Sequence, residues 1–386
     1  MNKILNRQAF FADGTPFYRL YTSDGTGYGV RLRFRTAKDN AELVTVVTDS
    51  MKADMHKCFT EGRFDYYEVM LHYPECGTNY YFTVTGAETD EGKRTAVYNK
   101  RGVMDGVQDY YNFNFYPEFK TPDWAKGAVF YQIFTDRFCN GDPTNDVLDR
   151  EYSYVKLHSE QEKDWQAYPH DMDVCHFYGG DLQGIMHKLD YLQDLGIEVL
   201  YLNPIFVSPS NHKYDIQDYD YIDPHFGKIV NDNGKLLEDG DNNNEHAQRY
   251  KVRTTDLANL EASNKLFVEL VEKAHAHGIK IIIDGVFNHC GSFNKWMDKE
   301  KFYTKNKNYK SGAYISKDSP YNLYFKFLED RWPDNNSFEG WWGFDTLPKL
   351  NYEGSQELWN YVLDIGRKWV SHPYNVDGWR LDVAAD

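Results

Sequence analysis

The 386-residue chain has no long apolar stretches, since nowhere do about 18 apolar residues run together, and no membrane span is expected. Its start, MNKILNRQAFFADGTPFY, shows neither a sustained apolar run nor a cleavage site, so no signal peptide is predicted. Basic residues are in the minority, because 43 Lys and Arg face 59 Asp and Glu for a net charge of −16. This balance argues against nucleic acid or an anionic membrane as the partner and is compatible with a neutral substrate.

Cysteine is scarce and scattered, and the spacing fits neither a metal site nor a disulfide framework. We therefore expect reduced thiols in a cytoplasmic protein. Aromatic residues, by contrast, make up 17% of the chain and include 31 Tyr and 9 Trp. Such rings form platforms for sugars as well as cores, and composition alone favours the core. The five cysteines are Cys58, Cys76, Cys139, Cys175 and Cys290.

The first part of the chain, residues 1–118, has the pattern of an all-β module. Short alternating runs such as YGVRLRFRT and AELVTVVT are separated by Gly, Asp and Asn turns at close spacing, which predicts a β-sandwich. A stretch with two prolines, PEFKTPDW, follows and indicates a linker over 119–127.

From residue 128 to 386 the pattern changes to α/β. Largely apolar runs at 128–134, 197–203, 279–285 and 375–383 predict four strands. The helical patterns LQGIMHKLDYLQDLG and ANLEASNKLFVELVEKAHAHG lie between them, and each ends on a glycine, the usual C-terminal stop. Strand, helix and strand at this spacing predict βαβ units and a parallel sheet.

Two long segments interrupt this pattern. Residues 226–256 are polar and acidic, including LEDGDNNNE, and are expected to form a solvated surface insertion. Residues 290–350 are rich in Tyr, Trp and Phe and are too long for a plain loop, so they are predicted to form a small subdomain after the third strand.

Polar residues suited to chemistry follow all four predicted strands. The strands run into FTDRFCNGD, NPIFVSPSNHKYD, DGVFNH and GWRLD, and in a parallel barrel the carboxyl ends of the strands face the active site. Arg380 and Asp382 are spaced by two, so they share one face of the last strand. One interpretation is that Arg380 keeps a reactive Asp382 ionised, because a nearby cation lowers the pKa of a carboxyl. The alternative is a purely structural ion pair.

A group of hard oxygen ligands follows the first strand. Asn140, Asp142, Asn145 and Asp146 lie within seven residues of sequence, and such ligands suit Ca²⁺ rather than zinc or copper. The alternative is a solvated turn rich in Asx residues, which is common.

Three motifs resemble glycoside hydrolase family 13, the α-amylase family. Asp284–His289 (DGVFNH) and Gly378–Asp382 (GWRLD) are similar to its third- and fourth-strand motifs. Leu347–Asn351 (LPKLN) resembles the motif of the neopullulanase, cyclomaltodextrinase and maltogenic amylase branch. The resemblance covers the chain except 226–256. It implies a (β/α)8 TIM barrel of which about the first four strands are present, with an inserted subdomain at 290–350 and an N-terminal all-β sandwich.

The resemblance also assigns catalytic roles. It implies that Asp382 is the nucleophile of a retaining glycosidase and that Arg380 holds it ionised. Asp284 organises the site by hydrogen bonding, and His289 donates a hydrogen bond to a sugar hydroxyl. For substrate binding it implies that Tyr214 stacks under the sugar being cleaved with His212 beside it. The further substrate-binding residues expected are Asn288, Trp341 and Phe344. The aromatic segment Glu339–Phe344 is expected to line the cleft, with packing inside the subdomain as the alternative for either tryptophan.

Further implications concern the metal, the catalytic acid and the partners. Gly179, through its carbonyl, and Asp181 complete a structural calcium shell. The family's catalytic acid is a glutamate after the fifth strand, which would lie beyond Asp386. We therefore expect the chain to be a fragment that is inactive alone. The alternatives are that a second polypeptide completes the barrel or that the half-barrel self-associates. The family branch carries Asn-Glu where Ala385 and Asp386 stand here, and it implies a homodimer through the N-terminal module.

The sequence therefore predicts a retaining hydrolase of α-1,4 glucosidic links, with α-1,6 links as further candidates. The substrates expected are cyclodextrins, pullulan, maltodextrins or starch. A non-catalytic glucan-binding protein is the alternative from another class, because aromatic residues and a sandwich suffice for binding. A related glucanotransferase or isomerase is the third interpretation.

Overall fold

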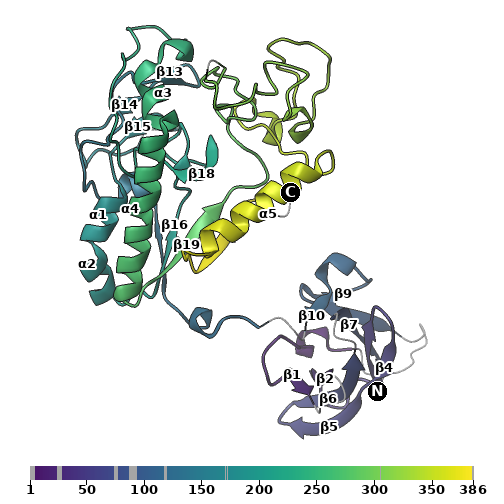
Figure 1. The fold of residues 1–386 in the computed structure, drawn as a ribbon. Coiled ribbons are helices and arrows are strands. Elements are labelled where there is room, and N and C mark those ends of the chain that lie inside the picture. The colour runs from purple at the N-terminus through teal and green to yellow at the C-terminus, as the bar shows by residue number, and fades with distance from the viewer. Residues whose placement is uncertain are drawn as a thin grey trace. The chain divides into compact units, whose positions relative to one another are not determined.

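The chain divides into two compact units, Met1–Lys126 and Gly127–Asp386, shown with their elements in Figure 1. The sequence predicted a module over 1–118, a linker over 119–127 and a barrel part from 128. The computed structural model describes residues 5–23, 28–73, 77–86, 94–116, 120–169, 171, 173–304 and 306–384.

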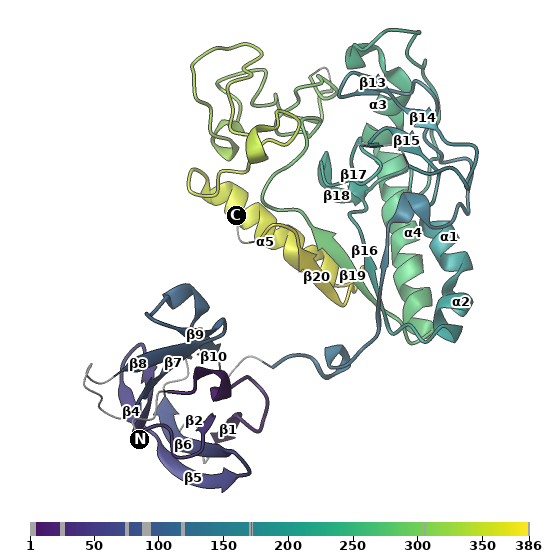
Figure 2. The ribbon, with the colours of Figure 1, turned by 180° about the vertical axis from the view of Figure 1, so that it is seen from behind.

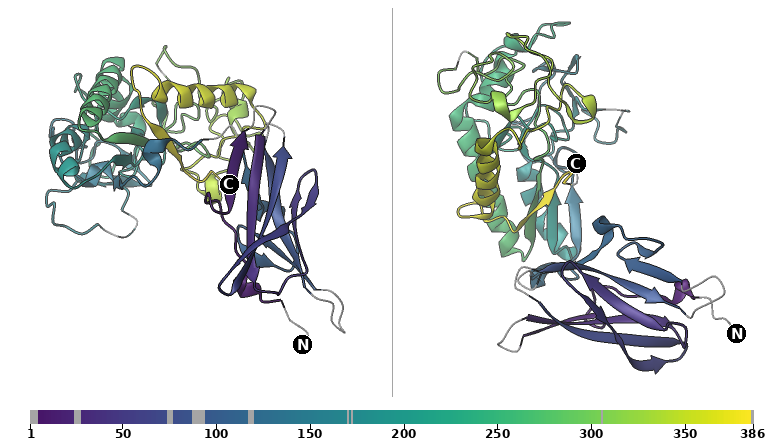
Figure 3. Two further views of the ribbon diagram at one scale, coloured as in Figure 1. Left: turned by 90° about the horizontal axis from the view of Figure 1, so that it is seen from below. Right: turned by 90° about the vertical axis from the view of Figure 1, so that its right-hand side faces the viewer.

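The first unit consists of two antiparallel sheets, which confirms the predicted all-β sandwich. One sheet has the strand order β1-β2-β6-β5, and the other has β4-β3-β7-β8-β9 with β10 beside β7. Figure 3 shows these strands side by side. In β2, Val30, Leu32 and Phe34 are fully buried and alternate with arginines, so one face forms the core between the sheets. The strands are β1 Arg19–Ser23, β2 Tyr28–Ala37, β3 Leu43–Thr48, β4 Lys52–Asp54, β5 His56–Glu61, β6 Phe64–Tyr73, β7 Thr78–Thr85, β8 Thr95–Asn99, β9 Gly102–Met104 and β10 Phe113–Phe115.

The second unit is built on a four-stranded parallel sheet with the order β11-β16-β19-β20, as the sequence predicted. Figures 1 and 2 show helix α5 beside β19 and β20, with α1, α2 and α4 next to β16. Fully buried aliphatic and aromatic residues of these helices and strands form one core. The elements are β11 Phe130–Ile133, β16 Val199–Leu202, β19 Lys280–Gly285 and β20 Gly378–Leu381, with α1 Leu182–His187, α2 Leu189–Asp194, α4 Leu257–Ala276 and α5 Gln356–Val370.

The helix expected over 182–196 is in fact two helices. α1 and α2 meet at Lys188, where φ is −106° and ψ is 5°. The Lys188 N–H donates to the carbonyl of Ile185, three residues back, so the first helix closes on a tight turn before the second begins. The expected glycine stop is present at Gly196 after α2 and at Gly278 after α4, both with positive φ.

The segment 226–256 is not a purely solvated surface insertion, and this expectation was wrong. It contains helix α3 (Gln248–Thr255), whose Tyr250 and Arg253 are buried. Asn244, within the acidic run, is also buried and bonds to the backbone of Ser153. Leu237 and Tyr250 join a third apolar cluster, so the segment is anchored by its own core residues.

The segment 290–350 folds with little regular structure. Buried aromatic residues such as Trp296, Tyr324 and Phe338 join it to the core of the second unit. An isolated bridge between His289 and Lys349 returns its end to the carboxyl end of β19. The short elements of the molecule are β12 Ser153–Tyr154, β13 Leu157–His158, β14 Glu160–Gln161, β15 His176–Phe177, β17 Phe206–Val207 and β18 Asp218–Ile222, with 3-10 turns η1 Arg7–Ala9, η2 Asp109–Tyr111, η3 Asp123–Ala125, η4 Thr135–Arg137, η5 Asn244–His246, η6 Asn322–Tyr324 and η7 Trp341–Gly343.

No helix in the described ranges combines the length and the apolar character needed to cross a lipid bilayer. Four of the cysteines, Cys58, Cys139, Cys175 and Cys290, are free thiols, and Cys76 lies outside the described residues. Ala385 and Asp386, where the sequence departs from the family pattern, also lie outside them.

Candidate active site

Asp284 lies at the centre of the polar residues that follow the parallel strands. Its side chain is fully buried near the end of β19. The hydroxyl groups of Tyr201 and Tyr214 both donate to Oδ2, the latter at 2.9 Å, and Arg380 contacts both oxygens at 3.1 and 3.2 Å. Burial raises the pKa of Asp284, and these three donors offset the effect only in part. The carboxyl is therefore fully engaged and has no open side toward a substrate.

Arg380 connects Asp284 with Asp382. The same guanidinium nitrogen, Nη1, donates to both carboxylates. Burial by itself lowers the pKa of Arg380, but the two carboxylates overcome this effect and raise it. The Asp382 side chain is 14% exposed and Arg380 is 42% exposed, so the face that holds them is only partly covered. A carboxylate that is ion-paired yet still reachable suits a nucleophile better than the enclosed Asp284 does.

Tyr214 and His212 are brought to the site by the loop after β16. The Tyr214 hydroxyl bonds to Asp284, and its ring centroid lies 5.8 Å from that of His212. The backbone N–H of Tyr214 donates to Nδ1 of His212 at 3.1 Å, which fixes the two rings relative to each other. Burial raises the pKa of Tyr214 to about 12 and lowers that of His212. Both groups are therefore neutral near pH 7.

His289 has one buried nitrogen without a partner. Nδ1 lies 3.3 Å from Oδ1 of Asn288, whereas no residue in the described part of the chain bonds to the buried Nε2. The imidazole stacks on Trp341, with centroids 5.0 Å apart and planes at 21°. Burial lowers the pKa of His289, although the charge of Asp382 counteracts it. His289 is 1% exposed, so Nε2 is a buried polar atom whose partner the described residues do not supply.

Two aromatic residues beside Trp341 are strongly exposed. Phe344 is 52% exposed, and Trp342 is 81% exposed and has φ of +51°. The Trp342 ring lies 5.5 Å from that of Trp341. Tyr201 was missed by the sequence interpretation, and the available signal was a hydroxyl in the otherwise aliphatic strand VLYL.

A cavity of about 350 Å³ opens beside Asp382 on the side of α5. Asn288, Phe287, Leu350 and Trp359 are among the residues that line it. Tyr214, His289 and Trp341 do not line this cavity. Asp382 therefore lines a mostly apolar hollow against α5, and the aromatic surface around His289 lies outside this hollow.

The oxygen-rich loop after β11 brings part of the predicted calcium shell together. The side-chain carbonyl oxygens of Asn140 and Asn145 are buried without a partner in the described residues. Asn140 donates to Asp146 at 2.8 Å, and burial together with nearby Asp181 raises the pKa of Asp146 to about 6. Gly179 packs against them so closely that a Cβ there would lie 2.5 Å from Oδ1 of Asp146. Two orphaned amide oxygens and a crowded carboxylate fit a hard cation.

Asp142 and Asp181 have other partners in the same loop. Asp181 caps α1 by accepting from Gly184 at 2.6 Å, and it also accepts from the N–H of Asp142 at 2.8 Å. Asp142 pairs with Lys228 at 2.7 Å. Their carboxylates thus organise the backbone of the loop, and among the described residues no group of three or more His, Cys, Asp and Glu side chains has the geometry of a metal site.

Comparison with known proteins places this geometry in a family. Residues 132–244 and 256–386 match the family described as "Alpha amylase, catalytic domain", and residues 20–120 match "Alpha amylase, N-terminal ig-like domain". The segment skipped by the first match contains the whole of α3.

Relatives of the chain carry related names. Neopullulanase 2 of Thermoactinomyces vulgaris is 36% identical over 85% of this chain and 46% of that protein. The intracellular maltogenic amylase of Bacillus subtilis (strain 168) is 32% identical over 94% of this chain and 53% of that protein. The structure of the type III pullulan hydrolase from Thermococcus kodakarensis is 27% identical with a TM-score of 0.55, over 95% of this chain and 55% of that one.

The chain spans about half the length of these three relatives. The matched segments include Asp284, Arg380 and Asp382, as well as the sandwich that precedes them. The chain therefore belongs to the α-amylase family, glycoside hydrolase family 13.

Proposed function

We propose that this chain carries the nucleophile side of a retaining α-glucan hydrolase that cleaves α-1,4 and also α-1,6 glucosidic bonds. The observation that carries the proposal is the bridge from Arg380 to both Asp284 and Asp382, with the Tyr214 hydroxyl on the same buried carboxylate. The names of the relatives, neopullulanase, maltogenic amylase and pullulan hydrolase, support α-glucans as the substrate class.

In this mechanism Asp382 attacks the anomeric carbon, and a second carboxyl group protonates the leaving oxygen. Arg380 keeps Asp382 aimed, because its guanidinium bonds to that carboxylate and is itself held by Asp284. Asp284 is unsuited to be the acid, since it is fully buried and holds three donors. We assign the acid to the glutamate that the family places after a later strand.

Neutral polar groups and rings would hold the sugar at the bond to be cleaved. The unpaired Nε2 of His289 is positioned to bond a hydroxyl, and Tyr214 offers its ring face. Trp341, Trp342 and Phe344 would extend this surface, because exposed aromatic rings pack on the apolar faces of sugars. We further propose a cytoplasmic location, in line with the relative described as intracellular.

We also propose a structural Ca²⁺ held by Asn140, Asn145 and Asp146, with the carbonyl of Gly179 nearby. The ion would supply charge compensation for a buried carboxylate and would fix the loop after β11. The carboxylates of Asp142 and Asp181 would act through the loop backbone that they already hold.

The test is the Asp382→Asn variant of the complete natural protein that contains this sequence, assayed on cyclodextrin, pullulan and maltodextrin. We expect kcat to fall on the order of 10⁴-fold or more, since removing a nucleophile abolishes its covalent step. Mass spectrometry should detect a glycosyl adduct on the wild-type peptide containing Asp382. Asp364→Asn, a 75% exposed carboxylate on α5, is the control.

Unchanged turnover by Asp382→Asn would contradict the proposal. Binding of maltooligosaccharides by the wild-type protein without any turnover would instead favour the non-catalytic glucan-binding alternative. Products with new glycosidic links and little hydrolysis would favour a glucanotransferase.

A further inference from the structure

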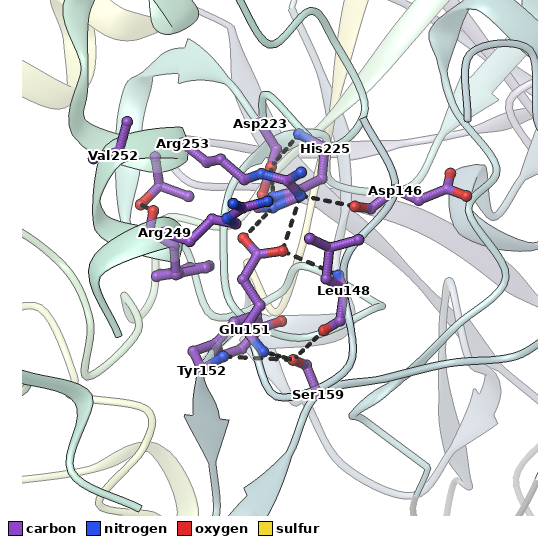
Figure 4. Close-up of polar contacts among 12 residues, drawn as sticks. Asp146, Leu148, Glu151, Tyr152, Ser159, Asp223, His225, Arg249, Val252 and Arg253 are labelled. Atoms are coloured by element: carbon purple, nitrogen blue, oxygen red, sulfur yellow. Dashed lines mark hydrogen bonds and ion pairs between the residues drawn. The ribbon is translucent and has the colours of Figure 1, made fainter. Parts of the chain in front are cut away.

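A chain of buried ionic groups runs through the second unit, and Figure 4 shows four of its members, Arg253, Glu151, His225 and Asp223. Its order is Arg253, Glu151, His225, Asp223 and Lys213, and we call it the buried ionic chain. The successive nitrogen–oxygen distances are 2.9, 2.9, 2.8 and 2.7 Å. Each of these residues is at most 3% exposed. Such an arrangement is costly to bury unless every charge is paired, so its members depend on one another.

One end of the buried ionic chain holds the loop over residues 140–146 after β11, which we call the candidate calcium loop. Nη1 of Arg253 donates to the backbone carbonyl of Asp146 at 2.8 Å as well as to Glu151. The other guanidinium nitrogens bond to Asp232 at 2.9 Å, so the fork is fixed in one orientation. Glu151 accepts from the N–H of Leu148 at 3.0 Å, which closes the loop on itself. The backbone around Asp146 is thus held by a cation from another element.

The other end holds the loop that carries His212 and Tyr214. Lys213 lies between these two residues and has φ of +59°, yet its ammonium is buried against Asp223. It also donates to the carbonyl of Ser208 at 3.0 Å, and the N–H of Ser208 donates to Asp223 at 3.0 Å. Lys213 thus anchors the backbone of the segment whose next residue, Tyr214, bonds to Asp284.

A second connection runs beside the first. The hydroxyl of Tyr152, next to Glu151, donates to the carbonyl of Pro209 in the same loop as Tyr214. The Tyr152 ring packs on Tyr250 of α3 with centroids 4.1 Å apart. Helix α3 therefore supplies both a ring and a guanidinium to the junction between the two loops.

Arg253 comes from a segment that lies between the two parts of the family match. The family match stops at residue 244 and resumes at 256, so Tyr250 and Arg253 lie outside it. A segment outside the matched residues thus provides the buried cation that faces Glu151. Arg253 contacts the backbone of one loop and not the site itself, so we relate it to the position of the loops rather than to the chemical step.

We propose that Arg253 is a positioning residue that fixes the backbone of the loop around Asp146 and, through the buried ionic chain, the loop bearing His212 and Tyr214. The significance of the second loop rests on the proposed function, in which Tyr214 contacts the sugar. The positions of the loops themselves do not depend on it. The candidate calcium loop and the sugar-contacting loop form one connected unit without any metal in the connection.

The test is hydrogen–deuterium exchange of the full chain, without substrate, for Arg253→Met. We expect backbone amides in 140–152 and 206–216 to exchange at least tenfold faster than in the wild type, while β19 is unchanged. Arg249→Met is the matched control, because Arg249 lies on the same helix and contacts Gly234 and Asp232 but not Asp146 or Glu151.

Arg253→Met leaves the buried charge of Glu151 without its cation. The double variant Glu151→Gln/Arg253→Met removes that charge too, so it distinguishes loss of the contact with Asp146 from the effect of an unpaired charge. If Arg253 positions the carbonyl of Asp146, exchange in 140–152 stays fast in the double variant. Wild-type exchange in the double variant, or in Arg253→Met itself, would overturn the proposal.

Should Arg253→Met not fold, Arg253→Lys retains the charge but replaces the planar fork by one ammonium. We expect faster exchange confined to the two loops, and exchange equal to that of the wild type would overturn the proposal. The experiment contains no substrate. If the complete natural protein has no glycosidase activity, the proposed function is wrong, but the exchange result for the two loops is unaffected.

Discussion

The carboxyl group of Asp284 shows how one residue organises the candidate site. It reaches Tyr201 on β16, Tyr214 on the following loop and Arg380 on β20, so three segments distant in sequence meet on two oxygen atoms. Because burial raises the pKa of this carboxyl, each donor stabilises the ionised form that the site requires. Removal of one donor should therefore have a measurable cost.

Tyr201→Phe is expected to lower the free energy of unfolding by about 1.5 kcal/mol, since a hydrogen bond to a buried carboxylate is lost without a change of packing volume. Urea unfolding of the second unit measures it. Tyr131→Phe on neighbouring β11, where the ring packs against Phe138, is the control. Equal losses in both variants would show that the contact with Asp284 contributes nothing.

His225 should make stability depend on pH. Its two ring nitrogens face Glu151 and Asp223, Tyr250 stacks on the ring, and Arg253 and Lys213 bond the same carboxylates. Burial alone lowers the pKa of His225, but the carboxylates overcome it and raise the pKa above 6.5. The stabilisation is thus fully present below about pH 6.5 and is lost as the pH rises through the raised folded-state pKa.

The measurement is the difference in unfolding free energy between the wild type and His225→Asn across this range. The difference should be largest at low pH and shrink on the alkaline side. Asp232, which is 36% exposed and bonds to Arg253, also faces this region, so the salt concentration is held constant. A difference independent of pH would contradict the expected titration of His225.

At the scale of elements, the helices are placed by their ends and their apolar faces. α4 buries Leu260, Phe267 and Leu270 against the sheet and the loop before it, and Asp256 accepts from the N–H of Ala258 at 3.0 Å at its start. α5 starts in the same way, with Ser355 accepting from Leu358. These caps satisfy backbone donors that the first turn leaves open.

Asp256→Ala should destabilise the second unit by about 1 kcal/mol, because the cap of α4 and the bond from Asn231 are both removed. Asp256→Asn keeps a side-chain acceptor and should cost much less. Thermal unfolding of both variants measures the difference. A loss as large in the Asn variant would indicate that the charge of Asp256, and not its acceptor oxygen, stabilises the helix.

At the scale of the whole molecule, the two units have separate cores. The sandwich core and the core of the parallel sheet share no residue, and the candidate calcium loop belongs only to the second unit. A ligand that binds only the folded form of one unit stabilises that unit alone.

Calcium is therefore expected to raise only the unfolding transition of the second unit, by about 2.7 kcal/mol at a concentration of 100 times Kd. Calorimetry with Ca²⁺ and with a chelator measures the shift. Asp146→Asn should remove it, whereas Asp190→Asn, a 93% exposed carboxylate of the same unit, should not. A calcium response that survives Asp146→Asn would place the ion elsewhere.

Local pattern was enough to predict the order of the main elements. The alternation in β2 and the apolar runs at β11, β16, β19 and β20 depend on period and hydrophobicity, which are properties of neighbouring residues. It failed at Lys188, where one helical pattern is broken by a tight turn, and over 226–256. In that segment the polar sequence gives no sign that Tyr250 and Arg253 are buried, because their partners lie about 100 residues earlier in the sequence.

The sequence by itself determined the class of each unit, the family and the identity of Asp284, Arg380 and Asp382, since these follow from motifs and spacing. Tertiary structure alone decided that Asp284 is enclosed while Asp382 is reachable, and that Tyr201 donates to Asp284. The physical reason is that burial and hydrogen-bond partners depend on which strands lie side by side. That pairing is set by packing across the whole unit and not by any short stretch of the chain.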